Sequence, residues 1–591
     1  MITTIQKRDG RLANFDINKI ANAIQKAFCS TVGKKEYSTC LQLAKTVSQH
    51  LQQNNLYSPS VEQIQDMVEK VLIENGHIGT AKAYILYRAE RTRIRNMNSR
   101  LMKTFEDITY KDVNDSDIKR ENANIDGNTA MGSMLKYGSE GAKHFYEEYV
   151  LNPAHSEAHQ NGDIHIHDLD FYTLTTTCCQ IDLLKLFHNG FSTGHGVVRE
   201  PNDIASYAAL ACIAIQSNQN DQHGGQAIVN LDYGLAPGVK KTYLKRYHSN
   251  MVSSIELIVN AEMAEKTKQV LKELSQKGIF ATIDENECYT KQETEALTTI
   301  GLSIEEIQKA QCFSKKKSLE ETDKATYQAM ESLIHNLNTM HSRAGAQTPF
   351  SSVNYGMDTS TEGRMVVKNL LLVTEVGLGN GETPIFPIQI FRVKEGINFN
   401  PGEPNYDLFR LSCRVSAKRL FPNFSFQDAP FNMQYYKGTP ETEIAYMGCR
   451  TRVMANVYDE SKQISPGRGN LSFTTINLPR IAILSNGNID WFYTELDRKI
   501  DIVIEQLLER FEIQAKKKVC NFPFLMGEGV WIDSEKLNSN DEIREVLKHG
   551  TLSVGFIGLA ECLKALIGMH HGESEVAQNL GLDIISHMRH R

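Results

Sequence analysis

The sequence predicts an α/β protein in which a small N-terminal unit precedes a much larger region. Three observations lead to this prediction. A tight turn followed by amphipathic helices occupies residues 1–95. Between about 160 and 560, strand-like apolar segments alternate with helix-like segments, which is typical of a parallel sheet covered by helices. The length of 591 residues also exceeds that of a typical single domain.

The N-terminal unit begins with a predicted β-hairpin. Apolar runs at 2–6 and 12–15 flank Asp9-Gly10, a strong signal for a two-residue turn. Four helices should follow, the third starting after Ser60 with Gln63 as the other half of a capping box and the fourth covering 80–95. The apolar faces expected for the first two helices comprise Ile17, Ile20, Ala21, Ile24, Ala27 and Phe28, and then Cys40, Leu43, Ala44, Val47 and Leu51.

Composition excludes several functional classes. A net charge of −7 gives no basic footprint for nucleic acid, so we expect no direct nucleic-acid partner. The early charged residues show no signal peptide, and the apolar run at 552–569 contains Glu561 and Lys564, which favours a core helix over a membrane span. Eleven scattered cysteines indicate reduced thiols in the cytoplasm. We expect five of them to be buried as small apolar residues, namely Cys29, Cys40, Cys212, Cys413 and Cys562.

A single thiol stands out at Met447-Gly448-Cys449-Arg450. Gly448 removes a Cβ clash, so the chain can turn sharply or approach a ligand closely beside the cysteine. Asn470 follows 21 positions later in Gly467-Arg468-Gly469-Asn470, just before an alternating strand at 471–478. This pattern predicts a thiol at the tip of a loop or hairpin. Asn470 lies in a glycine-rich loop of its own, and its amide offers both a donor and an acceptor.

A histidine-rich segment, His165-Ile166-His167-Asp168, precedes the first parallel strand. Because side chains alternate along a strand, His165 and His167 should share one face. Three interpretations stay open. The segment is similar to the metal-binding histidines of metallohydrolases, it matches a reductase motif discussed below, or it is a set of hydrogen-bonded polar residues at a strand end.

Other candidate residues lie at predicted strand ends. Cys178 and Cys179 are neighbours on a strand, so they should point to opposite faces and have different roles. Ser351 and Ser352 follow a polar loop into a strand and suit ribose or phosphate oxygens. A glycine-rich turn between a strand and a helix suggests that phosphates lie near Gly550, Thr551 and Ser553.

Together these motifs resemble the anaerobic (class III) ribonucleoside-triphosphate reductases, a glycyl-radical family. The resemblance rests on Met-Gly-Cys-Arg followed by Gly-Arg-Gly-Asn, on the His-x-His-Asp segment, and on the Cys-x-x-Ile-Asp strand that begins at Cys178. It implies that residues 126–591 form a ten-stranded α/β barrel of the glycyl-radical enzyme type. The radical cysteine would lie on a loop that threads the centre of this barrel. Periodicity alone predicts only an α/β fold.

Residues 1–95 resemble an ATP-cone, the regulatory nucleotide-binding domain of many ribonucleotide reductases. The resemblance implies that ATP or dATP binds there as an allosteric effector. We expect Lys7, Arg8, Arg11 and Lys19 to contact the phosphates, because basic side chains lie beside a tight turn and a helix start. The alternative is a solvated basic hairpin. Residues 96–125 are predicted to be a linker and the helix that leads into the barrel.

The resemblance implies reduction of ribonucleoside 5′-triphosphates to 2′-deoxyribonucleoside triphosphates for anaerobic DNA precursor synthesis. Cys449 would be the thiyl-radical residue, Cys178 the proton donor to the departing 2′-oxygen, and Asn470 a hydrogen-bonding partner of the sugar or the reductant. His165 would be a substrate-binding residue. Met447 together with Asn470 is the pattern of the formate-using branch, with a thioredoxin-like dithiol as the alternative reductant. The implied partners are a radical-AdoMet activating enzyme and a second copy in a homodimer.

Two family features have no counterpart in these 591 residues. The glycine that stores the radical, in an Arg-Val-x-Gly-Tyr type of motif, is absent, and so are the Cys-x-x-Cys pairs of the family's zinc site. We therefore expect a chain that is incomplete at its C-terminus, with no metal site of its own. The alternatives are a catalytically inactive nucleotide-binding remnant, one half of a split reductase, and a metal-dependent hydrolase that uses His165, His167 and Asp168.

Overall fold

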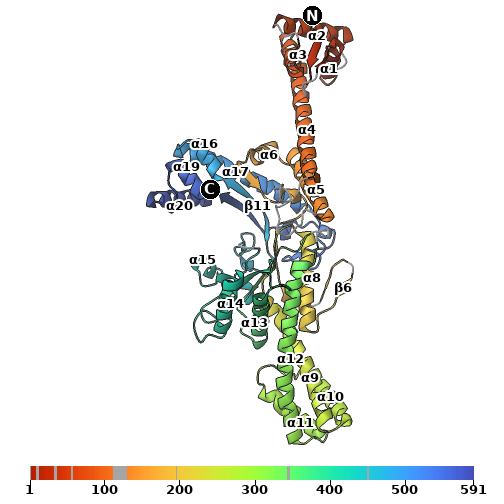
Figure 1. Ribbon diagram of the computed structural model, residues 1–591, viewed down its shortest axis with the longest axis vertical. Coiled ribbons are helices and arrows are strands. Elements are labelled where there is room, and N and C mark those ends of the chain that lie inside the picture. The colour runs from red at the N-terminus through yellow and green to blue at the C-terminus, as the bar shows by residue number, and fades with distance from the viewer. Residues whose placement is uncertain are drawn as a thin grey trace. The chain divides into compact units, whose positions relative to one another are not determined.

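The structure is a computed structural model with two compact units, residues 1–110 and 111–591, which are treated separately below (Figure 1). The residues that it describes are 2–7, 12–31, 36–54, 58–110, 129–188, 190–194, 196–342, 347–448 and 451–591, with the side chains of 93–100 left aside.

The N-terminal unit is a two-stranded hairpin followed by four helices. Its elements are β1 (Thr4–Gln6), β2 (Leu12–Asn14), α1 (Ile17–Cys29), α2 (Tyr37–Gln53), α3 (Val61–Glu74) and α4 (Ile78–Tyr110). The two strands pair antiparallel, as predicted, while the Asp9-Gly10 turn lies outside the described residues. The helices bury the predicted apolar faces against one another. The Ser60–Gln63 capping box is present.

Two details of this part of the chain differ from the prediction. Helix α4 continues to Tyr110 instead of ending near residue 95, so much of the expected linker is helical. Cys29 is exposed because it is the last residue of α1, beyond the part of the helix that packs. Cys40, Cys212 and Cys562 are buried as predicted, whereas Cys413 is exposed.

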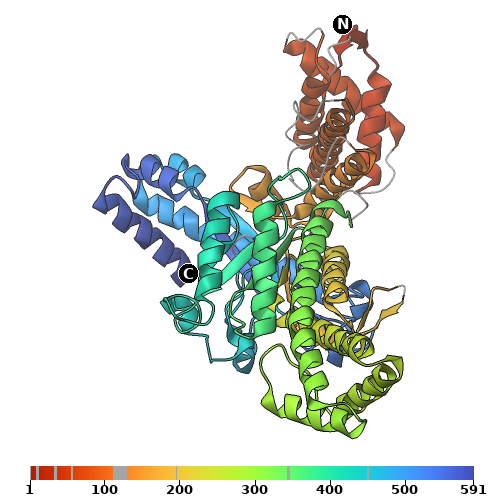
Figure 2. The ribbon, with the colours of Figure 1, turned by 60° about the horizontal axis from the view of Figure 1, so that its bottom comes forward.

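The larger unit is built around a parallel sheet in the order β10-β9-β8-β7-β4. Its strands are β4 (Cys179–Ile181), β7 (Gln226–Ile228), β8 (Ser351–Tyr355), β9 (Ile388–Val393) and β10 (Asn423–Phe426), and all four neighbouring pairs are parallel. Helices lie side by side over one face of this sheet (Figure 2). They are α8 (Ile204–Asp221), α12 (Ile304–Thr339), α13 (Thr361–Val376) and α14 (Tyr406–Arg419). Their packing against the sheet forms the largest apolar core.

A second sheet has the order β12-β11-β3, with β12 parallel and β3 antiparallel to β11. Its strands are β3 (Ile164–Ile166), β11 (Asn470–Asn477) and β12 (Thr551–Ile557). The core beside it involves helices α6 (Pro153–Gln160), α16 (Leu478–Ser485), α17 (Ile489–Ala515), α19 (Leu559–Ile567) and α20 (Glu575–His590). Backbone hydrogen bonds join the start of β4 to the start of β11, from Thr177 to Leu471 and from Gln180 to Arg468.

The described strands therefore support the α/β class, while the closed ten-stranded barrel stays a prediction. They form a five-stranded and a three-stranded sheet joined along β4 and β11, together with two small hairpins. The remaining elements of this unit are short or peripheral. They include α5 (Ala130–Phe145), α7 (Leu183–His188), β5 (Phe191–Ser192), β6 (Val197–Val198), α15 (Pro430–Met433) and α18 (Arg544–Leu547).

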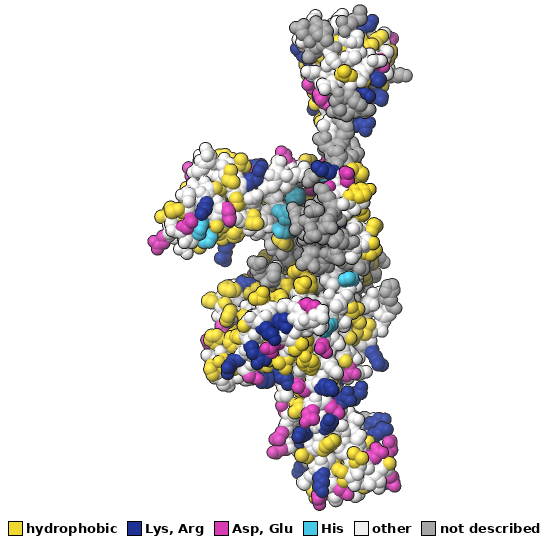
Figure 3. Space-filling model, in the orientation of Figure 1, with side chains coloured by type: hydrophobic (Ala, Val, Ile, Leu, Met, Phe, Trp, Pro, Cys, Tyr) yellow, Lys and Arg dark blue, Asp and Glu magenta, His cyan; other side chains and the backbone are white. Residues whose placement is uncertain are grey.

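A helical arm extends from the larger unit. It consists of α9 (Leu231–Ile258), α10 (Ala261–Gln276), α11 (Glu287–Thr299) and the first part of α12, which enclose a small apolar core. Basic and acidic side chains are mixed over the arm in the face seen in Figure 3. In the described part of the chain, no helix is both long enough and apolar enough to cross a membrane.

Candidate active site

Cys178 lies immediately before β4, and its side chain is buried. It packs in a small cluster with Ala227, Met447 and Val453. Burial raises the pKa of Cys178 to about 12, so the sulfur carries its proton at neutral pH. Its neighbour Cys179 belongs to the large core on the helix-covered side of the sheet. The two thiols thus occupy opposite faces of the strand.

Asn470 is held next to Cys178 by the junction of the two sheets. The Cys178 N–H donates to the backbone carbonyl of Asn470 at 3.2 Å. The Asn470 side chain is nearly buried, and its Oδ1 accepts from the Thr551 hydroxyl at 3.5 Å. Gly469 makes this approach possible, because a Cβ there would lie only 1.8 Å from the carbonyl oxygen of Cys178. The glycine before Asn470 is therefore required by packing.

Arg468 explains the rest of the Gly-Arg-Gly-Asn motif. Its buried guanidinium donates to carbonyl oxygens of the neighbouring loops. The acceptors are the backbone oxygens of His549, Met454, Ile464 and Ala455. Burial lowers the pKa of Arg468 to about 10, which still leaves it charged at neutral pH. Arg468 ties the start of β11 to the loop before β12.

Residues 444–448, called the finger segment below, lead to the candidate radical cysteine. Met447 and Thr451 form an antiparallel bridge in which the Met447 N–H donates to the Thr451 carbonyl at 2.7 Å. Gly448 has a φ of +56°, in the left-handed region, as a sharp turn requires. Cys449 itself lies outside the described residues. Met447, two residues before it, and Val453, four residues after it, both pack in the cluster that contains Cys178.

Polar side chains from the sheet hold the finger segment. Asn354 accepts from the Tyr446 N–H and donates to the Tyr446 carbonyl, both at 2.9 Å. Gln427 makes the same pair of bonds with Ile444. Gln180 donates to the Ala445 carbonyl at 2.8 Å, and Ser352 Oγ accepts from the Gly448 N–H at 3.1 Å. Sequence reasoning missed the three amides, because no motif marks them.

A buried ion pair precedes the finger segment. Arg392 on β9 contacts Glu443 at 2.7 Å and Asp232 at 3.4 Å. The Tyr233 hydroxyl donates to the other oxygen of Glu443 at 3.0 Å. Burial raises the pKa of Glu443 to about 7, although Arg392 opposes this shift. Asp232 also accepts the backbone N–H groups of the turn after β8 at Gly356. This network fixes the base of the finger segment to β8 and β9.

A cavity of about 640 Å³, called the histidine pocket below, opens beside the finger segment. The residues that line it include His159, His165, His167, Lys136, Lys143 and Gly225. The rings of His165 and His167 meet edge to face, with their centroids 4.6 Å apart, so the two side chains lie on the same face of the strand, as predicted. His167 stacks on Phe473 of β11. A Cβ on Gly225 would lie 3.2 Å from the Cα of Gly448, so the pocket borders the finger segment.

Comparisons with known proteins agree with this geometry. The sequence profile of the family described as anaerobic ribonucleoside-triphosphate reductase matches residues 121–591, and that of the ATP cone domain matches residues 3–93. The chain belongs to the anaerobic ribonucleoside-triphosphate reductase family. Members of this family are oxidoreductases.

Two relatives illustrate the extent of the match. The anaerobic ribonucleoside-triphosphate reductase of Haemophilus influenzae is 29% identical over 98% of this chain and 73% of its own length. The Escherichia coli enzyme is 28% identical over 100% of this chain and 74% of its own length. The chain therefore spans about three quarters of the length of these relatives.

Solved structures show the same fold at low identity. The Thermotoga maritima anaerobic ribonucleotide reductase in complex with dATP and CTP gives a TM-score of 0.51 at 11% identity, covering 85% of this chain and 73% of that one. Another anaerobic ribonucleotide reductase gives the same TM-score, covering 84% of this chain and 66% of the other.

Within this reductase, the candidate substrate residues fall into separate places. His165 lines the histidine pocket. Ser352 contacts the finger segment, whereas Ser351 is one step along β8, and the strand alternation turns it to the other face. Thr551 and Ser553 pair with β11 opposite Asn470 and Phe473. Gly550 lies just before β12, and Thr551 and Ser553 lie in its first half. The helix after this strand, α19, starts only at Leu559, so these three residues do not lie at a helix N-terminus.

The candidate effector residues of the ATP-cone are only partly described. Lys7 and Lys19 are exposed beside the hairpin and on α1. Arg8 and Arg11 lie outside the described residues. Their contact with nucleotide phosphates therefore stays a prediction.

Two observations bear on other uses of the larger unit. Among the described side chains, no group of three or more His, Cys, Asp or Glu is arranged to hold a metal ion, and His167 Nε2 is hydrogen-bonded to Thr475 at 2.7 Å. The hydrolase interpretation thus gains no support.

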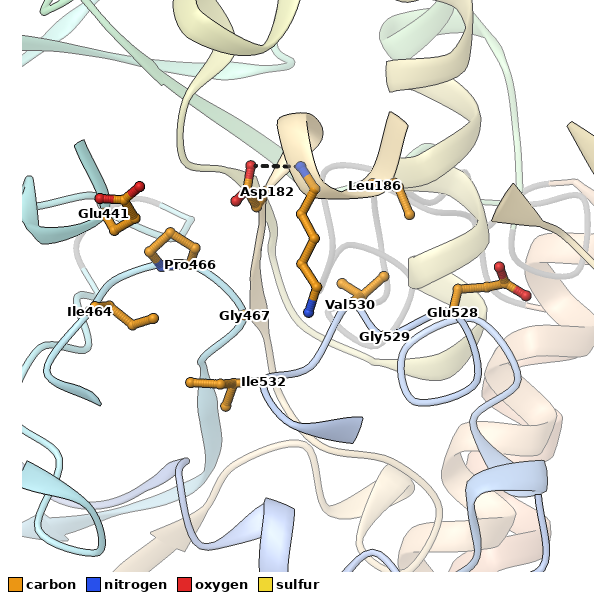
Figure 4. Close-up of a pocket in the computed structure, with 11 residues that line it drawn as sticks. Asp182, Leu186, Glu441, Ile464, Pro466, Gly467, Glu528, Gly529, Val530 and Ile532 are labelled. Atoms are coloured by element: carbon orange, nitrogen blue, oxygen red, sulfur yellow. Dashed lines mark hydrogen bonds between the residues drawn. The ribbon is translucent and has the colours of Figure 1, made fainter. Parts of the chain in front are cut away.

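A smaller cavity of about 130 Å³ lies near Gly467 (Figure 4). Its acidic lining, Asp182, Glu441 and Glu528 against Lys185, disfavours a triphosphate.

Proposed function

We propose that this chain reduces ribonucleoside triphosphates to 2′-deoxyribonucleoside triphosphates by thiyl-radical chemistry, with formate as the reductant. The proposal rests on family membership and on one geometric observation. Cys178 contacts both the strand that carries Asn470 and the side chain of Met447, two residues before Cys449. Cys178, Met447 and Asn470 thus lie on adjoining buried segments. This supports the proposal, because radical chemistry of this kind requires that water be excluded.

The chemical steps follow from the thiols. A thiyl on Cys449 takes the hydrogen atom from C3′ of the ribose and leaves a carbon radical there. The protonated thiol of Cys178 then supplies the proton with which the 2′-hydroxyl departs as water, as its raised pKa allows. Formate contributes two electrons and leaves as carbon dioxide, so that nucleotide, formate and one proton give deoxynucleotide, carbon dioxide and water. Asn470 holds the sugar hydroxyl or the formate through its amide.

The histidine pocket is the proposed place for the substrate nucleotide. Its volume of about 640 Å³ lies in the range of ligand sites. Lys136 and Lys143 of α5 bring positive charge to its wall, which favours a triphosphate. Burial and the neighbouring His165 lower the pKa of His167 to about 4, so this ring is neutral and can line a site for base or ribose. We include as further proposed contacts of the substrate Ser351, Ser352, Gly550, Thr551 and Ser553.

The wider scheme adds regulation and activation. ATP and dATP would bind the ATP-cone through Lys7, Arg8, Arg11 and Lys19. A radical-AdoMet enzyme would generate the glycyl radical on a glycine that these 591 residues do not include, and the reductase would act as a homodimer in the cytoplasm. The glycyl radical supplies the oxidising equivalent that converts the Cys449 thiol to a thiyl.

The test joins the chain to the radical-glycine segment of a relative, adds the activating enzyme, S-adenosylmethionine and formate, and measures dCTP formed from CTP. Cys449→Ser and Cys178→Ser should abolish the product. Cys179→Ser is the matched control, since its thiol faces the helix-covered core. Formation of dCTP by Cys449→Ser would contradict the proposal.

An inactive remnant is the second candidate, and one half of a split reductase is the third. A remnant would bind ATP and dATP and give no dCTP even with the added segment. A split reductase would give dCTP when the segment is added as a separate chain. The assay therefore separates the three when it is run both with the fused segment and with the segment added as a separate chain.

A further inference from the structure

We propose that Asn354, Gln427 and Gln180 are positioning residues that set the register of the finger segment and thereby the place of Cys449. This inference rests on the proposed function for the role of Cys449. In this proposal three buried amides form the hydrogen bonds to the backbone that neighbouring strands form elsewhere in the sheet. The sites concerned lie on β4, on β8 and just after β10.

The contacts have the period of a β-strand. Gln427, Asn354 and Ser352 bind the backbone of residues 444, 446 and 448, in that order along the segment. Gln180 binds residue 445 from the first strand of the sheet, β4. In an extended chain the N–H and C=O of alternate residues point to the same side. The finger segment is thus bound as a strand would be. Residues 444, 446 and 448 are bound on one side, and residue 445 is bound on the other.

The chemistry of the amide explains why these residue types are needed. A strand neighbour offers each residue both an acceptor and a donor, and a carboxamide is the side chain that offers both in one planar group. Asn354 and Gln427 each use the two functions on a single residue of the finger segment. In the described part of the chain, no β-strand pairs with residues 444–446. The amides therefore satisfy backbone groups that burial would otherwise leave unpaired.

Register matters because the reaction is sensitive to distance. A slip of one residue along a strand moves the chain by roughly 3.3 Å and turns every side chain to the other face. Hydrogen-atom transfer requires the sulfur and C3′ to be in near contact, and a displacement of about 1 Å can cost a factor of about 100 in rate. Gly225 approaches the end of the finger segment closely, since a Cβ at residue 225 would lie 3.2 Å from the Gly448 Cα.

The decisive variants keep shape and remove one function. Asn354→Asp and Gln427→Glu still accept from the finger N–H groups, but a carboxylate cannot donate to the facing carbonyl. Ser352→Ala is a milder variant that removes only the acceptor for the Gly448 N–H. The matched control is Asn369→Asp, which changes a buried amide of α13 whose hydrogen bonds go to Met365 and Asp323.

Two readouts on the full chain need no turnover. We expect amide hydrogen exchange of residues 442–448 to accelerate at least about 10-fold in Asn354→Asp and Gln427→Glu, while residues 470–477 keep their protection. Alkylation of Cys449 by iodoacetamide, followed by mass spectrometry, should accelerate by a similar factor. Ser352→Ala should show a smaller change in the same direction, and Asn369→Asp none at these residues.

Other outcomes would overturn the inference. Unchanged exchange and alkylation in Asn354→Asp and Gln427→Glu would show that the amides do not set the segment. Suppose instead that hydrogen exchange accelerated equally over residues 442–448 and 470–477 in every variant, Ser352→Ala included. The amides would then contribute only to general stability. In the activated enzyme we expect kcat to fall at least about 10-fold with KM little changed. If Cys449→Ser remained active while the exchange results held, the proposed function would fail and the positioning role would stand.

Discussion

The finger segment and strand β11 both carry candidate active-site residues, but they are held in different ways. Strand β11 pairs with β12 on one side. On its other side it pairs with β3 at residues 474–476, and the Cys178 N–H donates to the Asn470 carbonyl, so backbone bonds fix Asn470. The finger segment is fixed by side chains of Gln427, Asn354, Gln180 and Ser352. The comparison teaches that one half of the site depends on backbone geometry and the other on the identity of a few amides.

The first prediction concerns the thiol on the β11 side. With a pKa near 12 against an ordinary value of 9.0, Cys178 should carry about 1,000-fold less thiolate at pH 8 than an exposed cysteine. Iodoacetamide should therefore modify Cys178 at least about 100-fold more slowly than the exposed Cys520. Peptide mapping over time measures both rates. Comparable rates would mean that Cys178 is not held buried against Met447.

The second prediction breaks the β11 side through its backbone. Gly469→Ala places a Cβ 1.8 Å from the Cys178 carbonyl oxygen, so β4 and β11 must separate. We expect a loss of stability of at least about 3 kcal/mol, seen as a lower melting temperature. Gly138→Ala in α5, where a Cβ meets nothing within 4 Å, should be neutral or stabilising. Similar behaviour of the two variants would contradict the close packing at Gly469.

The third prediction concerns pH and the base of the finger segment. The pKa of Glu443 is raised from 4.5 to about 7, so the folded state binds its proton more tightly than the unfolded state does. This contribution, at most about 3 kcal/mol, is present below pH 4.5 and is lost as pH rises through 7. Glu443→Gln should reduce the fall in melting temperature between pH 5 and pH 8. An unchanged fall would show that Glu443 is already ionised throughout.

The fourth and smallest effect is expected at Thr551. Its hydroxyl lies 3.5 Å from Asn470 Oδ1, at the limit of a hydrogen bond. Because β11 is fixed by its backbone, Thr551→Ala should change stability by less than about 0.5 kcal/mol. Hydrogen exchange of residues 470–477 should also stay unchanged. A large loss of protection in these residues would show that a side chain, and not the backbone alone, holds β11 in place.

Local patterns predicted the N-terminal unit well, and for a physical reason. The faces of α1 and α2 follow from a helical period that a short window reveals. Cysteine burial was predicted less well, because position on the helix decides it. Cys413 is exposed on α14 although its neighbour Ser412 is buried, since consecutive helix residues point in different directions.

The site divides along the same line. Short motifs single out Cys178, Asn470 and Met447, and the structure brings these three residues together. Their catalytic roles stay predictions. The supporting amides could not, since Asn354 and Gln180 meet the finger segment across 92 and 265 residues of sequence. An isolated Asn or Gln in a strand carries no signal of such a partner. The closed barrel likewise does not follow from strand periodicity, because strand order depends on contacts that are distant in the sequence.

The central claim is that the finger segment presents the thiol of Cys449 to the thiol of Cys178. Dibromobimane, which bridges two neighbouring thiols, tests this claim in the full chain, and mass spectrometry identifies the linked peptides. We predict a bridge between Cys178 and Cys449 that is formed in the wild type and reduced in Asn354→Asp. Absence of that bridge after an incubation long enough for Cys178 itself to be modified, or a bridge from Cys449 to a different cysteine, would contradict the account.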